Sequence, residues 1–70
     1  MPDSVYKVVE VVGTSRESWE KAAAAAIERV AKTKRDLRVA EIVKLDVTLN
    51  DSGKADIYRA KLNVSYKYED

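Results

Sequence analysis

The carboxylates of this 70-residue chain are the side chains with the clearest potential for chemistry. Calcium prefers several hard oxygen ligands, which proteins supply as carboxylates and main-chain carbonyls. Glu10 and Asp46 interrupt apolar, strand-like segments, and Asp51 lies in a short run of turn-forming residues, 50–53, that is too small for an EF-hand loop. We expect some subset of Glu10, Asp46 and Asp51 to bind a divalent cation where the fold or a second subunit brings them together. The alternative for each is a solvated or salt-bridged carboxylate.

Cationic side chains recur along the last apolar segment, at Arg59, Lys61 and Lys67. Pairing with acids such as Glu41 or Asp46 across strands or subunits is the simpler interpretation. A row of cations lining a channel or shell interior, where it would hold anions such as nucleotides or flavin phosphates, is the alternative.

Composition excludes several classes of function. The chain has no His and no Cys, so it lacks the commonest general base and the best nucleophile, and we do not expect an enzyme. With 13 basic and 12 acidic residues it has no cationic excess for nucleic acid. It has no apolar run long enough to cross a membrane and no leader-like apolar segment after its first residues, so we expect a cytoplasmic protein.

Periodicity predicts the elements that must position these groups, within a single domain over residues 1–70. Residues 5–12, about 38–49 and about 55–68 are rich in β-branched and aromatic residues at strand-like spacing. Between the first two, a stripe at helical spacing that starts at Trp19 predicts a helix over about 15–33. Gly13 is expected to end the first strand. Thr14 with Glu17 fits a capping box, and Ser15 is the alternative N-cap.

The order β-α-β-β predicts an α+β fold in which a three-stranded antiparallel sheet, in the order 1-3-2, partly wraps around one helix. Strict alternation along the second strand would place one set of residues on a common face: Val39, Glu41, Val43, Leu45, Val47 and Leu49. A helix of about 28 Å cannot cover strands of about 36 Å. We therefore expect the remaining apolar sheet surface to bind further copies of the chain.

The ordered set of segments resembles the dodecins across essentially the whole chain. The residues that carry the likeness are Val5-Tyr6-Lys7-Val8, then Val11-Val12-Gly13-Thr14-Ser15, the helix and the long hairpin. Ser18-Trp19-Glu20 with the following alanines, and the last strand from Tyr58 to Lys67, are most similar to the calcium dodecins. The resemblance implies a hollow homododecamer built from trimers.

In flavin-binding dodecins, a tryptophan at the start of the second strand and a glutamine on the third hold the isoalloxazine ring. The corresponding positions here are Val39 and Arg59, and a valine offers no ring for stacking. The resemblance thus implies a self-assembling shell that binds or buffers a small ligand or ion, with calcium leading and flavin disfavoured. The alternatives are an FMN or riboflavin storage dodecin with altered stacking residues, and a small homo-oligomeric interaction module without a ligand.

Overall fold

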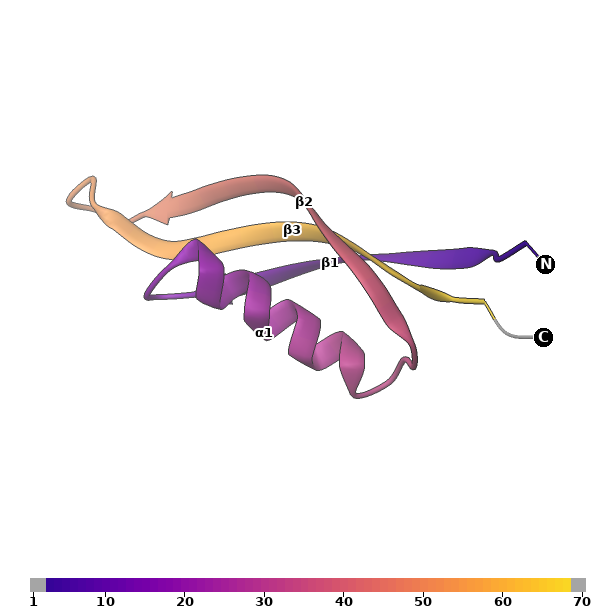
Figure 1. The fold of residues 1–70 in the computed structure, drawn as a ribbon. Helices are drawn as coiled ribbons and strands as arrows, with labels where there is room; N and C mark the ends of the chain where they lie inside the picture. Colours follow the sequence, from indigo (N-terminus) through magenta and orange to yellow (C-terminus); the bar gives the residue numbers. More distant parts are fainter. Residues whose placement is uncertain (1–2, 69–70) are drawn as a thin grey trace.

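The computed structural model describes residues 3–68 and contains one helix on one face of a three-stranded sheet (Figure 1). The elements are β1 (Tyr6–Ser15), α1 (Trp19–Ala31), β2 (Leu37–Leu49) and β3 (Ala55–Lys67). Both neighbouring pairs are antiparallel and the order is β1-β3-β2, which confirms the predicted topology. The start of β1 and the end of β3 lie at one end of the molecule and the β2–β3 turn lies at the other (Figure 1).

Strand β1 runs past the predicted end at Gly13, because its pairing with β3 continues to Ser15 opposite Tyr58. The helix therefore starts later than predicted, and neither expected N-cap is used. Ser18 caps it instead, and its hydroxyl oxygen accepts a hydrogen bond from the Lys21 amide at 3.0 Å. Tertiary pairing has overridden the local capping signal.

The helix packs against the sheet at very short range. An added Cβ at Gly13 would lie only 1.9 Å from the Ala22 carbonyl oxygen and 2.9 Å from the Ala26 Cβ. Glycine at this position of β1 and alanines on α1 are what allow the two backbones to approach. The buried core consists of small or branched residues: Ala22, Ala23, Ala26, Val30, Ala60, Leu62 and Val64.

Strand β2 breaks the strict alternation that the sequence suggested. Ile42 lies opposite Leu62 and Leu45 lies opposite Ala60, with a register shift between Ile42 and Lys44. Because directly paired residues share a face, the helix side of β2 changes from even to odd positions at this bulge. The predicted single face from Val39 to Leu49 is therefore wrong, and the residues before and after the bulge must be assigned separately.

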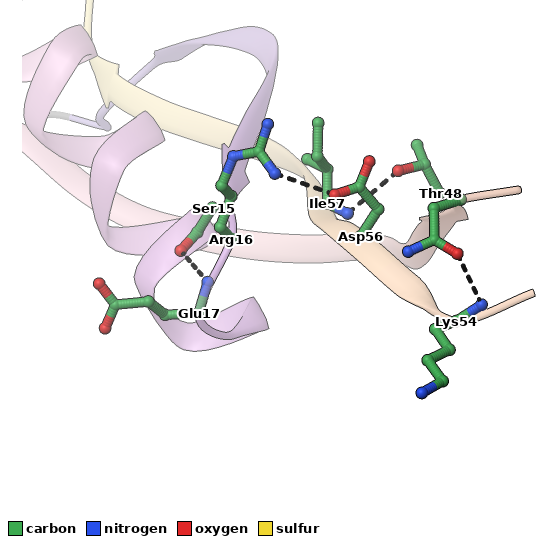
Figure 2. Close-up of polar contacts among 8 residues, drawn as sticks. Ser15, Arg16, Glu17, Thr48, Lys54, Asp56 and Ile57 are labelled. Atoms are coloured by element: carbon green, nitrogen blue, oxygen red, sulfur yellow. Dashed lines mark hydrogen bonds and ion pairs between the residues drawn. The ribbon is translucent and has the colours of Figure 1, made fainter. Parts of the chain in front are cut away.

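Polar contacts fix the end of the sheet near the start of α1 (Figure 2). The Arg16 guanidinium donates to Asp56 at 2.9 Å, and the Ser15 hydroxyl oxygen accepts from the Glu17 amide at 3.0 Å. On the neighbouring hairpin, the Ile57 amide donates to the Thr48 hydroxyl at 3.0 Å. Of these bonds, the one from Arg16 to Asp56 ties the connection between β1 and α1 to β3.

Much apolar surface stays exposed in the single chain. Helix α1 has 13 residues, about 20 Å, whereas β2 and β3 each have 13 residues at strand spacing, about 43 Å. The mismatch is larger than the sequence suggested. The exposed large apolar side chains include Val8, Val12, Val39, Ile42, Val43, Leu45 and Leu49. Between residues 3 and 68, no helix is both long and apolar enough to cross a membrane.

Replacing Gly13 by alanine is expected to lower the free energy of unfolding by about 3 kcal/mol or more, because the new methyl group would collide with helix backbone. Gly53→Ala is the matched control. Gly53 has a φ of 76° and no atom within 4 Å of an added Cβ, so only backbone strain of about 1–2 kcal/mol is expected. Urea unfolding at one fixed protein concentration measures both. Equal losses in the two variants would show that the close approach does not limit packing.

Candidate functional site

The face of the sheet opposite the helix has the charged residues of the candidate site. Asp46 on β2 lies directly opposite Arg59 on β3. The Arg59 Nε donates to one carboxylate oxygen at 2.7 Å, and its Nη2 donates to the other at 3.1 Å. This bidentate arrangement is the strongest geometry for such a pair. It confirms the interpretation in which Arg59 pairs with Asp46 across the two strands.

The pair keeps Asp46 ionised. Hydrogen bonds from Arg59, followed by the charges of Arg59 and Lys44, lower the pKa of the Asp46 carboxyl below its ordinary value. Because the pKa is lowered, the carboxylate keeps its negative charge as the pH falls through the range where an ordinary aspartate becomes protonated. The side chain of Asp46 is about one-third exposed, at 35%, so its oxygens remain within reach of solvent.

The main chain at Asp46 is held as well. The Trp19 indole nitrogen donates to the Asp46 carbonyl oxygen at 2.9 Å. The indole ring also packs edge-to-face on Tyr58, with the ring centroids 5.0 Å apart. Trp19 therefore anchors α1 to the strand that presents Asp46, although the residue is still 37% exposed in the single chain.

A shallow pocket of about 150 Å³ surrounds this pair, and its lining residues are Val12, Lys44, Asp46, Arg59 and Lys61. Lys61 lies directly opposite Lys44, so two cations face each other across β2 and β3. The Lys61 ammonium lies 3.7 Å from a carboxylate oxygen of Glu10 on β1. Glu10 is thus a weakly paired, exposed carboxylate beside the pocket. The acidic partner of Lys61 therefore lies on β1.

Asp51 lies apart from the other two predicted ligands, in the turn between β2 and β3. Its neighbour Asn50 is committed to the turn, because the Asn50 side-chain oxygen accepts from the amides of Ser52 and Lys54. Within residues 3–68 of one chain, no three acidic side chains gather closely enough to hold a metal ion. The side chains of one chain are therefore too few to coordinate a cation at these carboxylates, and further ligands are needed.

The two positions that correspond to the flavin site are also far apart in one chain. Val39 lies opposite Ser65, whereas Arg59 lies opposite Asp46. Arg59 and Ser65 are six positions apart on β3, which is about 20 Å along the strand. Val39 is 63% exposed, and Arg59 already donates to a carboxylate. A ligand touching both positions would have to lie between subunits.

Sequence reasoning missed a second charged region. One cleft, at the end of the sheet where β1 begins and β3 ends, is lined by four cations, Lys7, Lys34, Arg35 and Lys67. They come from three segments, and only the antiparallel pairing of β1 with β3 brings Lys7 beside the end of β3. No linear spacing in the sequence signals this convergence.

Comparison with known proteins identifies relatives that share this architecture. The family model for Dodecin matches residues 5–69. The Mycobacterium tuberculosis calcium dodecin is 47% identical over 64 residues, which cover 91% of this chain and 89% of the relative. Its crystal structure, described as a calcium chelating antigen with a novel calcium-binding site, has a TM-score of 0.83 and covers 94% of this chain and 93% of its own.

Two further relatives match this chain over nearly its whole length. The Thermus thermophilus dodecin is 39% identical over 66 residues, which cover 94% of each chain. The structure of the Streptomyces coelicolor dodecin has a TM-score of 0.92 at 28% identity and covers 100% of this chain and 99% of its own. Fold, strand order and family model agree over nearly the full length, and the chain belongs to the dodecin family.

Proposed function

We propose that this chain assembles into a dodecin-type homododecamer, a hollow shell of trimers, which binds and buffers calcium. The observation that carries the proposal is the 47% identity with a calcium dodecin across 91% of the chain. The partly exposed carboxylates of Asp46 and Glu10 on the sheet are consistent with it, because calcium binds carboxylates and carbonyls. A buffer needs no catalytic group, and the chain has neither His nor Cys.

Self-association follows from the small core. The molecule measures 57 × 20 × 15 Å, so it is too thin to bury much of its own apolar surface. Trp19, Ile42 and Leu45 line an apolar groove of about 270 Å³ between α1 and β2, and all three are more than one-third exposed. Both β1 and β2 are edge strands. A second copy of the same chain would cover such a groove and edge.

Light scattering is expected to give a particle of about 95 kDa for the native chain, since each of twelve chains has a mass of 7.9 kDa. Leu45→Lys is expected to shift the mass to smaller species, because a charge would be buried at a subunit contact. Lys54→Gln, in the β2–β3 turn, is the control and should leave the mass unchanged. A dimer or trimer of the native chain would favour an interaction module instead, and a folded monomer at micromolar concentration would contradict assembly.

The proposed ligands are Asp46 and Glu10, with Asp51 as a further candidate. Asp46 on β2 and Glu10 on β1 lie on the same face of the sheet, with β3 between them. Each is paired with one cation. Since one chain offers too few carboxylates in one place, we assign the remaining ligands to main-chain carbonyls, waters or a neighbouring subunit. In this arrangement Arg59 competes with calcium for the Asp46 oxygens.

Calorimetric titration with calcium tests this assignment. Asp46→Asn is expected to weaken calcium binding by at least about tenfold, because affinity depends on the number of charged ligands. Asp56→Asn is the matched control, since Asp56 is also an aspartate paired with an arginine on the sheet. It should leave affinity within about twofold. Equal affinities in native protein and Asp46→Asn would remove Asp46 from the site. Strong quenching of FMN fluorescence, without calcium heat, would favour the flavin alternative.

Removing the competitor should have the opposite effect. Arg59→Gln is expected to tighten calcium binding by about two- to fivefold, which is the range for freeing a carboxylate from an exposed ion pair. In the Asp46→Asn background the same substitution should change nothing, because there is no carboxylate left to release. Arg16→Gln, which frees Asp56 instead, is the control. An unchanged affinity in Arg59→Gln would mean that the pair persists when calcium is bound.

A further inference from the structure

Asp46 is held from two directions by two different side chains. Its carboxylate accepts from the Arg59 guanidinium at 2.7 and 3.1 Å, on the sheet face opposite the helix. Its main-chain carbonyl oxygen accepts from the Trp19 indole nitrogen at 2.9 Å. Trp19 is the first residue of α1. One bond therefore reaches from the start of the helix to the strand segment that carries the proposed calcium ligand.

The bond from the indole is the polar link between α1 and β2. Between residues 3 and 68, no other described hydrogen bond joins this helix to this strand. Strand β2 is an edge strand, so ladder bonds hold its backbone from one side only. A donor on α1 thus adds a restraint at Asp46 that the sheet does not supply.

The same indole lines the apolar groove between α1 and β2. The groove has a volume of about 270 Å³, and its lining residues are Trp19, Glu20, Ile42 and Leu45. Trp19 is 37% exposed, and Leu45, which directly precedes Asp46, is 47% exposed. Water can therefore compete for the hydrogen bond between the indole and the carbonyl in the single chain. Covering the groove would exclude that water and strengthen the bond.

A second copy of the chain is the occupant that suits this groove. Three of the four lining residues are apolar. Exposed apolar surface continues along the same strand at Val43 and Leu49, which are 48% and 65% exposed. The described part of the chain buries only seven apolar residues, so its own segments do not cover this surface. Removal of this apolar area from water favours contact between copies.

We propose that Trp19 is a positioning residue that couples calcium binding at Asp46 to contact with the next subunit. The coupling rests on the proposed function, in which Asp46 is a calcium ligand and the groove is a subunit contact. When a second copy covers the groove, the indole bond holds the Asp46 backbone more firmly. That segment is then ordered before calcium arrives, so calcium binding costs less conformational entropy. Calcium accordingly binds more tightly to the assembled form than to the separate subunit.

Linkage makes this coupling reciprocal. If assembly tightens calcium binding, calcium tightens assembly by the same factor at each site. We expect a factor of about fivefold, at the lower end of measured couplings, because a single hydrogen bond transmits it. Trp19→Phe isolates that bond, since phenylalanine keeps an aromatic ring in the groove but has no N–H donor.

Dissociation of the assembled protein by urea, followed by light scattering at one fixed protein concentration, tests the coupling. Calcium chloride is expected to raise the urea midpoint of the native particle and to leave that of Asp46→Asn unchanged. In Trp19→Phe the calcium-induced shift should fall to roughly half or less of the native shift. A purely structural role for Trp19 would lower the midpoint equally with and without calcium. The size of the shift is therefore the readout.

Tyr58→Phe is the matched control for this substitution. It removes the hydroxyl from the ring on which Trp19 packs, but it leaves both the ring and the indole donor in place. The calcium-induced shift in this variant should equal that of the native protein.

Calorimetric titration with calcium gives the reciprocal measurement, which does not require Trp19→Phe to assemble. Ile42→Gln adds a neutral polar group to the groove and is expected to give smaller particles, because that group would lose its water at a subunit contact. Calcium affinity in these smaller particles should be about fivefold weaker than in the native protein.

The possible failures are distinguishable. No heat of calcium binding in the native protein would overturn the proposed function and the coupling with it. Calcium heat with an unshifted dissociation midpoint would overturn the coupling alone. A full calcium-induced shift in Trp19→Phe would also contradict it, because another contact would then transmit the effect. If Ile42→Gln stays fully assembled, the groove is not a subunit contact and the coupling fails.

Discussion

The fold depends on one contact, in which the backbone of α1 lies directly against β1 at Gly13. Glycine on the strand and alanines on the helix are the only side chains small enough for this approach. The same small residues limit how much apolar area the contact can bury. A thin, close layer of helix on sheet is thus specific in its geometry, but it leaves the single chain with a small core.

Charged side chains are distributed differently in two regions of the molecule. Around Asp46 and Arg59 the surface is mixed, because Arg59 pairs with Asp46 and Lys61 pairs with Glu10. At the chain ends, the cations of β1, β3 and the α1–β2 connection gather without a described acid. The net charge of +1 hides this separation, because it averages a mixed surface and a cationic one. Function follows the local distribution, and the sum over the chain is a poor guide to which ligand binds where.

The topology was predictable because the periods of strand and helix differ clearly in this sequence. Trp19 and the alanines recur at helical spacing, whereas the flanking segments alternate. Boundaries were less predictable, since pairing with β3 carries β1 through Ser15 and moves the cap to Ser18. The bulge between Ile42 and Lys44 has no glycine or proline to signal it, so the faces of β2 required the structure.

The individual residues of the site were predictable from the sequence, but their arrangement in space was not. The pairing of Arg59 with Asp46 followed from two complementary charges on adjacent strands. The separation of Asp51 from Asp46, and the distance between Val39 and Arg59, depend on the register of the hairpin. Convergence of Lys7 with Lys67 likewise depends on the antiparallel pairing of two segments that are distant in the chain.

The hydrogen bond from the indole of Trp19 to the Asp46 carbonyl has a practical consequence. This is the chain's sole tryptophan, and the residue is still 37% exposed. Its emission spectrum is therefore an intrinsic optical probe of the backbone beside the Asp46–Arg59 pair. A change in the polarity or geometry of that strand segment alters the surroundings of this one fluorophore, so events there are observable in the unlabelled native protein.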